Sequence, residues 1–449
     1  MSAATDVSPR RSPLRDQGFR SFFVAHTVSQ LGDRVSDLAF PLIAVLVLDA
    51  TPGQVSVLTA LLWLPNLASI FVGAWIDRQQ HKVWILVAAD LARAALLVTV
   101  PLAFAFDGVT LVQLYVVALL TGAASALFNT TYPAFFVLLV PRSEYIAANS
   151  LLSASRSASY VAGPALGGLL VQVLSAPIAL LVDAFSFVVS ASFIARIRTL
   201  RTPPPPPPST EDAAPAKLLH DARDGLTFTL RHPVLRGVLG CCTTANFFTF
   251  VAASALIIVY ASRELQLSSG LIGLALGIGA AGGLVGAFSA PWLSRRLGVG
   301  VVVALGGVVF PASIAIVTLA GGPLWERAGA LALAEFFSGL GVMWFDINMN
   351  SVMATVIPHH LRARVSGAFS AVNYGVRPIG ALTGGALSAV IGLQATLWVA
   401  AVGGSLCVLW LIGNPVLRAR SLDDLVPGDD PGPDPDPAPG QSRGRSSSA

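Results

Sequence analysis

Twelve apolar stretches, each long enough to cross a lipid bilayer, run through this chain of 449 residues. A membrane-spanning α-helix needs about 20 mostly apolar residues. Stretches of that kind are centred near residues 34, 65, 94, 124, 159, 187, 248, 281, 310, 342, 377 and 404. Charged residues make up only 12% of the chain, whereas soluble domains carry roughly one-quarter. The pattern predicts an all-α membrane protein with twelve transmembrane helices, and no segment shows the sustained alternation of a β-barrel.

The lysine and arginine residues between these stretches predict the orientation of the chain. If both termini are cytoplasmic, 22 of these residues face the cytoplasm and only Arg263 and Arg327 face outward. Loops rich in Lys and Arg stay on the cytoplasmic side. We therefore expect both termini in the cytoplasm, with the first apolar stretch as the insertion signal. The net charge of +4 is then a topology signal rather than evidence for nucleic-acid binding.

Two polar segments divide the chain. Residues 198–233 contain six consecutive prolines, which favour an extended polyproline conformation, so we expect a cytoplasmic Pro-rich linker there. Residues 416–449 contain too little apolar material to fold and are expected to form a disordered acidic and Pro-rich tail. The remaining predicted segments are a cytoplasmic N-terminal tail (1–19) and two six-helix halves (20–197 and 234–415).

The two predicted halves repeat one another at a constant offset of 217 residues. The offset carries Trp75 to Trp292, Arg78 to Arg295, Gly122 to Gly339, Pro141 to Pro358, Gly163 to Gly380, Gly167 to Gly384 and Gly168 to Gly385. Parallel repeats of six helices are the architecture of transporters whose binding site lies between the repeats. The repeat therefore predicts a transporter with a site between the two halves.

A charged stretch after the second apolar segment carries a family resemblance. Gly73, Asp77, Arg78 and Lys82 resemble the G-x-x-x-D-[RK]-x-G-[RK]-[RK] motif that follows helix 2 in the major facilitator superfamily. Two positions differ from that motif, since Gln80 replaces its second glycine and His81 its first basic partner.

A second stretch strengthens this resemblance. Gly163, Pro164, Gly167 and Gly168 form the stretch GPALGG, which resembles the glycine and proline signature of helix 5 in antiporters of that superfamily. Small residues at this spacing permit close helix packing, and a role in preventing leak is implied only by the resemblance. The stretches QLGDRVSDLAFPL, VPRSEYIAANSL, DAFSF and IPHHLRARVSG are similar to the macrolide-efflux and siderophore-exporter branch. The resemblance covers roughly residues 16–415 and implies the twelve-helix major facilitator fold of a drug:proton antiporter.

The acid Asp77 suggests a gate at the cytoplasmic side. Basic residues beside a span only anchor it, whereas an acid can bind the start of a neighbouring helix. The repeat predicts such a helix start near Leu361, and we expect Asp77 to bridge to it when the protein is closed to the cytoplasm, as the resemblance also implies. Simple anchoring is the alternative. The predicted gate comprises Gly73, Asp77, Arg78, Lys82, Arg362 and Arg364, with Asp90 and Arg93 as a supporting i,i+3 pair.

Polar and ionisable residues in several predicted helices fall at one depth. Ionisable groups inside a bilayer are costly and face a cavity or a partner. We predict a central substrate cavity lined by Asp33, Arg34, Asp37, Asn129, Tyr132, Arg156, Tyr160, Asn246, Phe250, Asp346, Asn350, Asn373 and Arg377. The alternative is that ion pairs, such as Asp37 with Arg156 or Asp346 with Arg377, only hold the bundle together. Asp33 and Asp37 are the first choice for a proton-binding acid, followed by Asp346.

The sequence carries no catalytic signature. It lacks the phosphate-binding pattern G-x-x-x-x-G-K-[ST], so ATP is not expected to drive it directly. Its six histidines show no metal-ligand spacing, and its three cysteines lie in apolar stretches. We expect a plasma-membrane exporter of an amphipathic organic molecule, driven by protons, with no enzymatic activity, cofactor, metal or nucleic-acid partner. The alternatives are an importer of a small metabolite and, less favoured, a non-transporting receptor or scaffold.

Overall fold

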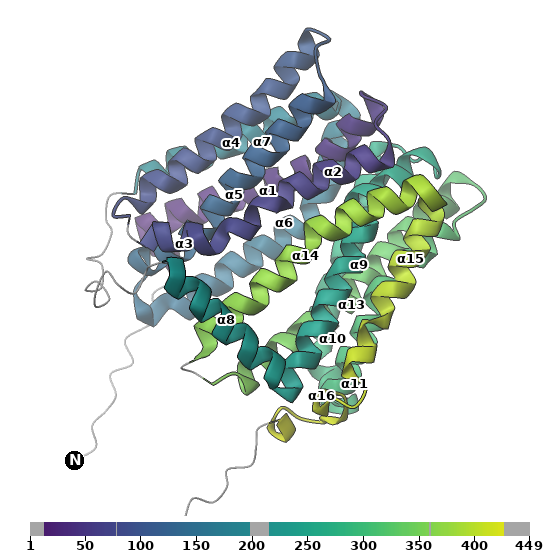
Figure 1. Cartoon of the computed structure of the whole chain (residues 1–449). Coiled ribbons are helices and arrows are strands. Elements are labelled where there is room, and N and C mark those ends of the chain that lie inside the picture. The colour runs from purple at the N-terminus through teal and green to yellow at the C-terminus, as the bar shows by residue number, and fades with distance from the viewer. Residues whose placement is uncertain (1–12, 78, 198–214, 359–360, 426–449) are drawn as a thin grey trace, which may run out of the picture.

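A computed structural model of the chain describes residues 13–77, 79–197, 215–358 and 361–425, except for some side chains such as those of Asp77 and Arg362. These ranges form a bundle of long α-helices (Figure 1). The first part contains η1 (Pro13–Arg15), α1 (Gln17–Leu46), α2 (Pro52–Trp63), η2 (Leu64–Ala68), α3 (Ser69–Asp77), α4 (Lys82–Ala105), α5 (Leu111–Leu139), η3 (Arg142–Glu144), α6 (Tyr145–Leu174) and α7 (Ala176–Ala195).

The second part begins with a short polar helix and continues with long apolar ones. It contains α8 (Pro215–Arg231), α9 (Pro233–Arg263), α10 (Ser269–Leu297), α11 (Val299–Ala312), α12 (Ile314–Thr318), α13 (Leu324–Val356), α14 (Arg362–Ile391), α15 (Leu393–Ser405), η6 (Leu406–Leu411), α16 (Pro415–Arg418) and η7 (Asp423–Leu425). No strand occurs in the ranges that the structure describes, in agreement with the all-α prediction.

Nine helical segments of the described chain are long and apolar enough to cross a membrane. They are α4, α5, α6, α7, α9, α10, α11 with α12, α13, and α15 with η6. The other three predicted centres, residues 34, 65 and 377, fall in α1, η2 and α14. Charged residues such as Asp33 and Arg377 lower the hydropathy of α1 and α14, whereas α2 and α3 are each short. The twelve-span count therefore stays a prediction.

The break between α2 and α3 lies at Pro65. Proline has no backbone N–H, so it cannot continue the α-helical hydrogen bonding, and a short 3₁₀ turn follows. The Asn66 side chain donates to the Trp63 carbonyl oxygen at 3.2 Å, and the Ser69 hydroxyl donates to the Asn66 carbonyl at 2.7 Å. These local hydrogen bonds stabilise the chain where regular α-helical hydrogen bonding is interrupted.

The glycines of the GPALGG stretch let α6 approach two other helices closely. A Cβ atom on Gly163 or Gly167 would meet atoms of Arg34 or Val35 on α1. A Cβ atom on Gly168 would instead meet Ser269 and Gly273 of α10. The first two glycines therefore pack α6 within the first part of the chain, and the third joins it to the second part.

The repeated stretch in α14 makes the same contacts with the two parts exchanged. Cβ atoms on Gly380 and Gly384 would meet the backbone of α9, and one on Gly385 would meet Gly53 and Ser56 of α2. Two equivalent contacts, α6 with α10 and α14 with α2, thus bring the two parts together at the end where α2 and α10 begin. The 217-residue offset of the sequence is in this way matched by the packing.

Polar contacts close the same end. The backbone N–H of Gly270 donates to the Gln172 side chain at 2.7 Å, and Arg263 pairs with Asp49 at 2.6 Å. A continuous apolar core lies beneath them and includes Leu58 of α2 together with Leu256 of α9. We call this end of the bundle the closed end.

The polar segment between the two parts contains a helix that the sequence analysis did not predict. Residues 215–231 form α8, which lies across the bundle and packs against α14 and α9 (Figure 1). Gly225 of α8 lies against the backbone of Arg364 at the start of α14. Residues 198–214, with the six prolines, lie outside the described part of the chain.

The predicted tail boundary at residue 416 requires a correction, because residues 415–425 are folded. Asn414 caps α16: its side-chain oxygen accepts from the Val416 N–H at 3.0 Å, and its amide donates to the Pro233 carbonyl at 2.7 Å. Val416 and Leu425 are buried. The Asp424 carboxylate accepts two backbone N–H bonds, which lower its pKa. A few apolar side chains are thus enough to dock this segment on the bundle.

The glycine contacts predict a steric switch at the closed end. In a variant without the three native cysteines, a cysteine at Ser56, whose side chain is 0% exposed, should react slowly with a water-soluble maleimide in detergent. Adding Gly385→Leu forces α14 away from α2, and we expect labelling to rise by about tenfold, a cost of about 1.4 kcal/mol to the closed contact.

Gly329→Leu is the matched control, because a Cβ atom there meets nothing within 4 Å. Equal labelling in the two leucine variants would show that the contact between α2 and α14 does not hold this end shut.

Candidate central cavity

A polar cavity of about 640 Å³ lies inside the bundle. Its described lining comes from α1, the broken helix α2–η2–α3, α5, α6 and α14 and comprises His26, Gln30, Trp63, Asn66, Leu67, Ser69, Ala126, Asn129, Thr130, Tyr132, Arg156, Tyr160, Gly367, Ser370, Ala371, Tyr374 and Arg377. Five of the predicted cavity residues are among them: Asn129, Tyr132, Arg156, Tyr160 and Arg377. Helices from both parts of the chain therefore form this cavity.

Arg377 of α14 is oriented by neutral partners. Its Nε–H donates to the Asn246 side-chain oxygen of α9 at 3.1 Å. Its guanidinium carbon lies 4.5 Å from the ring centre of Trp63, 4.3 Å from that of Tyr374 and 5.1 Å from that of Phe250. Such cation–π contacts stabilise a guanidinium without neutralising it. The predicted residues Asn246 and Phe250 thus contact Arg377 and are not among the described lining residues of the cavity.

Arg34 and Asp37 form an ion pair beside the cavity. Their side chains approach to 2.8 Å across one turn of α1, and the Arg34 guanidinium lies 4.3 Å from the ring centre of Tyr160. The alternative that paired Asp37 with Arg156 is therefore not what the structure contains. The reason is local geometry, because residues at i and i+3 of one helix meet without any tertiary contact.

A second cluster of charges is buried between α1, α4 and α7. Arg93 forms a close ion pair with Asp90, and its other guanidinium nitrogen lies 3.9 Å from Asp33. The same guanidinium stacks on Phe187 at 4.0 Å and on Phe128 at 4.8 Å. We call Asp33, Asp90, Arg93 and Asp183 the Arg93 cluster.

Asp183 completes this cluster from α7. It accepts hydrogen bonds from Ser36 of α1 and from Ser186, the latter at 3.0 Å. Asp90 and Asp183 are 0% and 1% exposed. The predicted i,i+3 pair of Asp90 and Arg93 is present and lies inside the bundle with Asp33, because the helix faces of α1, α4 and α7 that carry these charges point toward one another. Its predicted support of the gate stays a prediction.

The remaining predicted cavity residues lie away from the cavity lining. Asp346 and Asn350 are exposed on α13. Asp346 forms no ion pair with Arg377, because their side-chain nitrogen and oxygen atoms do not approach within 4.0 Å. Asn373 is half-buried, with its side-chain oxygen unpaired.

The predicted gate is only partly described. Arg78 and the side chains of Asp77 and Arg362 lie outside the described residues. Lys82 donates to the Gln79 carbonyl at 2.8 Å, and Gly73 lies against Thr130 of α5. Arg364 is exposed at the start of α14. The gate therefore stays a prediction.

Several lining residues escaped the sequence analysis. His26 packs against Phe22 and Tyr132, with ring centres 5.8 and 5.6 Å away, and those two rings also contact each other at 5.6 Å. Trp63 and Asn66 flank the proline break of the second apolar stretch. The sequence feature that could have identified Asn66 is a polar side chain next to a proline inside an apolar stretch. Tyr374 lies three residues before Arg377, so the i,i+3 rule that grouped other pairs also points to it.

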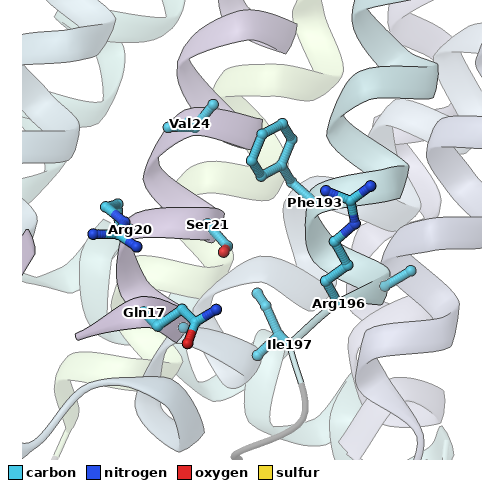
Figure 2. Close-up of a pocket in the computed structure, with 9 residues that line it drawn as sticks. Gln17, Arg20, Ser21, Val24, Phe193, Arg196 and Ile197 are labelled. Atoms are coloured by element: carbon cyan, nitrogen blue, oxygen red, sulfur yellow. The ribbon is translucent and has the colours of Figure 1, made fainter.

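A second depression of about 650 Å³ lies between the beginning of α1 and the end of α7. Arg20, Ser21, Phe193 and Arg196 are among its lining residues, and Figure 2 shows Ser21 on the side of α1 toward Phe193 and Arg196. It shares no described lining residue with the central cavity, and only the first part of the chain contributes to it. The central cavity is therefore the better candidate for a site between the two parts.

Membrane-spanning helices around a polar interior cavity define a membrane transport protein. A family model described as Major Facilitator Superfamily matches residues 22–381. The chain belongs to the Major Facilitator Superfamily. It is a multi-pass transporter of the plasma membrane and not an enzyme.

Curated relatives cover nearly the whole chain. The chain is 28% identical over 430 residues to "Multidrug efflux pump Tap" of Mycobacterium tuberculosis, covering 94% of this chain and 98% of the relative. It is 26% identical over 415 residues to "Uncharacterized MFS-type transporter YfiS" of Bacillus subtilis, covering 90% and 94%.

Solved structures share the fold. A mutant of the nucleoside transporter NupG has a TM-score of 0.67 at 14% identity, over 89% of this chain and 99% of that one. A bacterial homologue of the iron transporter ferroportin, in an inward-facing state, has a TM-score of 0.64 at 18% identity, over 90% and 99%. At these identities the likeness concerns the fold alone.

The buried position of the Arg93 cluster predicts a large stability effect. Asp90→Ala leaves the Arg93 guanidinium buried without its closest partner, which should lower the free energy of unfolding by about 3–5 kcal/mol. Asp37→Ala removes an acid whose side chain is 60% exposed, so it should cost only about 0–1 kcal/mol. Denaturation of the purified variants in mixed micelles measures both. Equal losses would mean that the Arg93 cluster is not a buried network.

Proposed function

We propose that this transporter exports an amphipathic organic molecule by alternating access, coupled to the inward movement of protons. The observation that carries the proposal is a polar, aromatic-lined cavity between the two parts of the chain, beside a closed end. Such a mixture of polar and aromatic groups suits a bulky substrate with a few polar handles. The efflux direction is supported by the similarity to "Multidrug efflux pump Tap" of Mycobacterium tuberculosis, which extends over 98% of that relative.

The proposed topology has twelve spans in two six-helix halves, 20–197 and 234–415, with both termini in the cytoplasm. It is supported by the distribution of Lys and Arg and by helical segments at every predicted centre. In this topology α2 and α10 begin on the outer side, so the closed end faces outward. The described conformation is then one in which the cavity is reached from the cytoplasm.

The proposed proton-binding acid is Asp33. Its carboxylate lies between the cavity helix α1 and Arg93, with 28% of the side chain exposed, whereas Asp90 and Asp183 are shut away from solvent. When such an acid binds a proton, it loses its attraction to the guanidinium. Protonation of Asp33 would therefore change how α1 packs against α4 and α7. Asp37 is less suited, since its partner Arg34 lies on its own helix.

Efflux from cells tests this function directly. Cells that produce the protein, loaded with a panel of anionic and cationic fluorescent dyes, should retain less of the transported dye than cells without it. A protonophore should remove that difference, because it collapses the driving gradient. Asp33→Asn should lose the protonophore-sensitive part of efflux while the protein stays in the membrane.

Two other outcomes identify the rival functions. Higher dye accumulation in producing cells would indicate an importer, and a protein that moves no dye in either direction would fit a receptor or scaffold. Efflux that continues unchanged in the presence of the protonophore would contradict proton coupling.

The proposed gate predicts a transport defect without a folding defect. In the state closed to the cytoplasm, Asp77 would bind the start of α14 near Arg362 and Arg364, where the helix N-terminus favours an acid by about 0.3–1 kcal/mol. Asp77→Ala should therefore reduce the rate of efflux severalfold, with normal membrane insertion measured by immunoblotting of the membrane fraction. Glu144→Ala, at the start of α6, is the matched acidic control. Wild-type efflux in Asp77→Ala would reduce the charged stretch to an anchor.

A further inference from the structure

Four arginines lie well inside long helices, and they differ in whether an acidic side chain lies close enough to form an ion pair. Arg34 pairs with Asp37 at 2.8 Å, and Arg93 pairs with Asp90 and approaches Asp33. Among the described residues, no carboxylate oxygen lies within 4.0 Å of Arg156 or Arg377. The two arginines without a counter-charge are the two that line the central cavity.

The cavity itself supplies no negative charge to them. Its described lining contains two arginines and one histidine but neither aspartate nor glutamate. Asp346 of α13, the predicted partner of Arg377, forms no ion pair with it and is not among the described lining residues of the cavity. An uncompensated charge inside a bilayer costs several kcal/mol, so a fold that pairs Arg34 and Arg93 leaves these two unpaired at a cost.

The partners of Arg377 position it without satisfying its charge. Asn246 binds only its Nε–H, and three aromatic rings pack around the guanidinium. Its terminal NH₂ groups have no carboxylate partner within 4.0 Å in the described part of the chain. A guanidinium presents paired donors that match a carboxylate or phosphate oxygen pair. Arg377 is thus preorganised to bind an anion.

The surroundings of these arginines are suited to an apolar body attached to that anion. Trp63, Tyr160 and Tyr374 contribute rings to the lining, and Tyr160 and Tyr374 are 50% and 42% exposed. Exposed aromatic faces next to a cation favour a planar or apolar group with an acidic substituent.

We infer that the cavity binds amphipathic organic anions, with the acidic group held by Arg377 of α14 and Arg156 of α6. The inference rests on the proposed transport function and narrows its substrate class. Because one arginine comes from each proposed half, an anion bound by both links the two halves. The acidic group of the bound molecule then supplies the negative charge that the described cavity lining lacks.

Binding to the purified protein in nanodiscs tests this inference without any transport. The probes are naphthylacetate, naphthylacetamide and naphthylethylamine, which share one aromatic body and differ in charge. We expect the acid to bind about tenfold more tightly than the amide, equivalent to about 1.4 kcal/mol, and the amine to bind most weakly. Arg377→Gln and Arg156→Gln should each remove the preference for the acid while the affinity for the amide stays the same.

Arg196→Gln is the matched control, because it removes an arginine from the other basic depression (Figure 2). It should leave the preference for the acid unchanged. Loss of the preference in Arg196→Gln, but not in the cavity variants, would place the anion at the wrong pocket and overturn the inference. Equal binding of the three probes, or a preference for the amine, would also overturn it.

A cysteine at Asn129 gives a readout that does not depend on folding of the arginine variants. Asn129 lines the cavity and is exposed, so Asn129→Cys in the cysteine-free protein should react with a water-soluble maleimide. Naphthylacetate should slow that reaction and naphthylethylamine should not. Selective binding of the acid without any efflux would contradict the proposed export function and support the anion site. Efflux without selective binding of the acid would support export and contradict the anion site.

Discussion

A few glycines allow helices from the two parts of this transporter to pack with their backbones in close contact. Gly168 lies against α10 and Gly385 lies against α2, and in both places a side chain would collide with the neighbouring helix. Lipid provides no hydrophobic drive between helices, so close packing of small residues is what holds them together. Both of these equivalent contacts lie at the closed end of the bundle. Three of the elements in these contacts, α2, α6 and α14, also contribute residues to the lining of the central cavity.

The distribution of charge follows a second rule. Charges that support the fold are paired locally or buried together, as in the Arg93 cluster, where Asp90 and Asp33 approach one guanidinium and Asp183 accepts hydrogen bonds from Ser36 and Ser186. Charges that face the cavity have neutral neighbours, as Arg377 has in Asn246. This division separates the residues that hold α1, α4 and α7 together from those available to a substrate.

Much of this architecture could be predicted from the sequence, because apolar length and a repeated glycine pattern are properties of the chain itself. Hydropathy located helical segments at every predicted centre, and the resemblance at the GPALGG stretch led to the correct family. The rise of a helix also gives the depth of each polar residue, which explains why Arg156, Tyr160 and Arg377 were found together.

Depth alone does not give the direction in which a side chain points. Asp33 and Asp346 were predicted at one depth, yet Asp33 faces Arg93 and Asp346 lies outside the described cavity lining. The partner of Asp37 was missed because one turn of α1 already supplies Arg34. Helix α8 was missed because a polar amphipathic helix lacks the apolar length by which the spans were recognised.

The central claim is that contacts at the closed end exchange with contacts at the opposite end around one cavity. Double electron–electron resonance on two spin-label pairs measures this exchange most directly. One pair joins Gln54 of α2 to Val390 of α14 at the closed end, and the other joins Ala147 of α6 to Leu297 of α10 at the opposite end. On changing pH or adding a transported compound, the first distance should lengthen while the second shortens. Two distances that stay constant, or that lengthen together, would contradict alternating access in this protein.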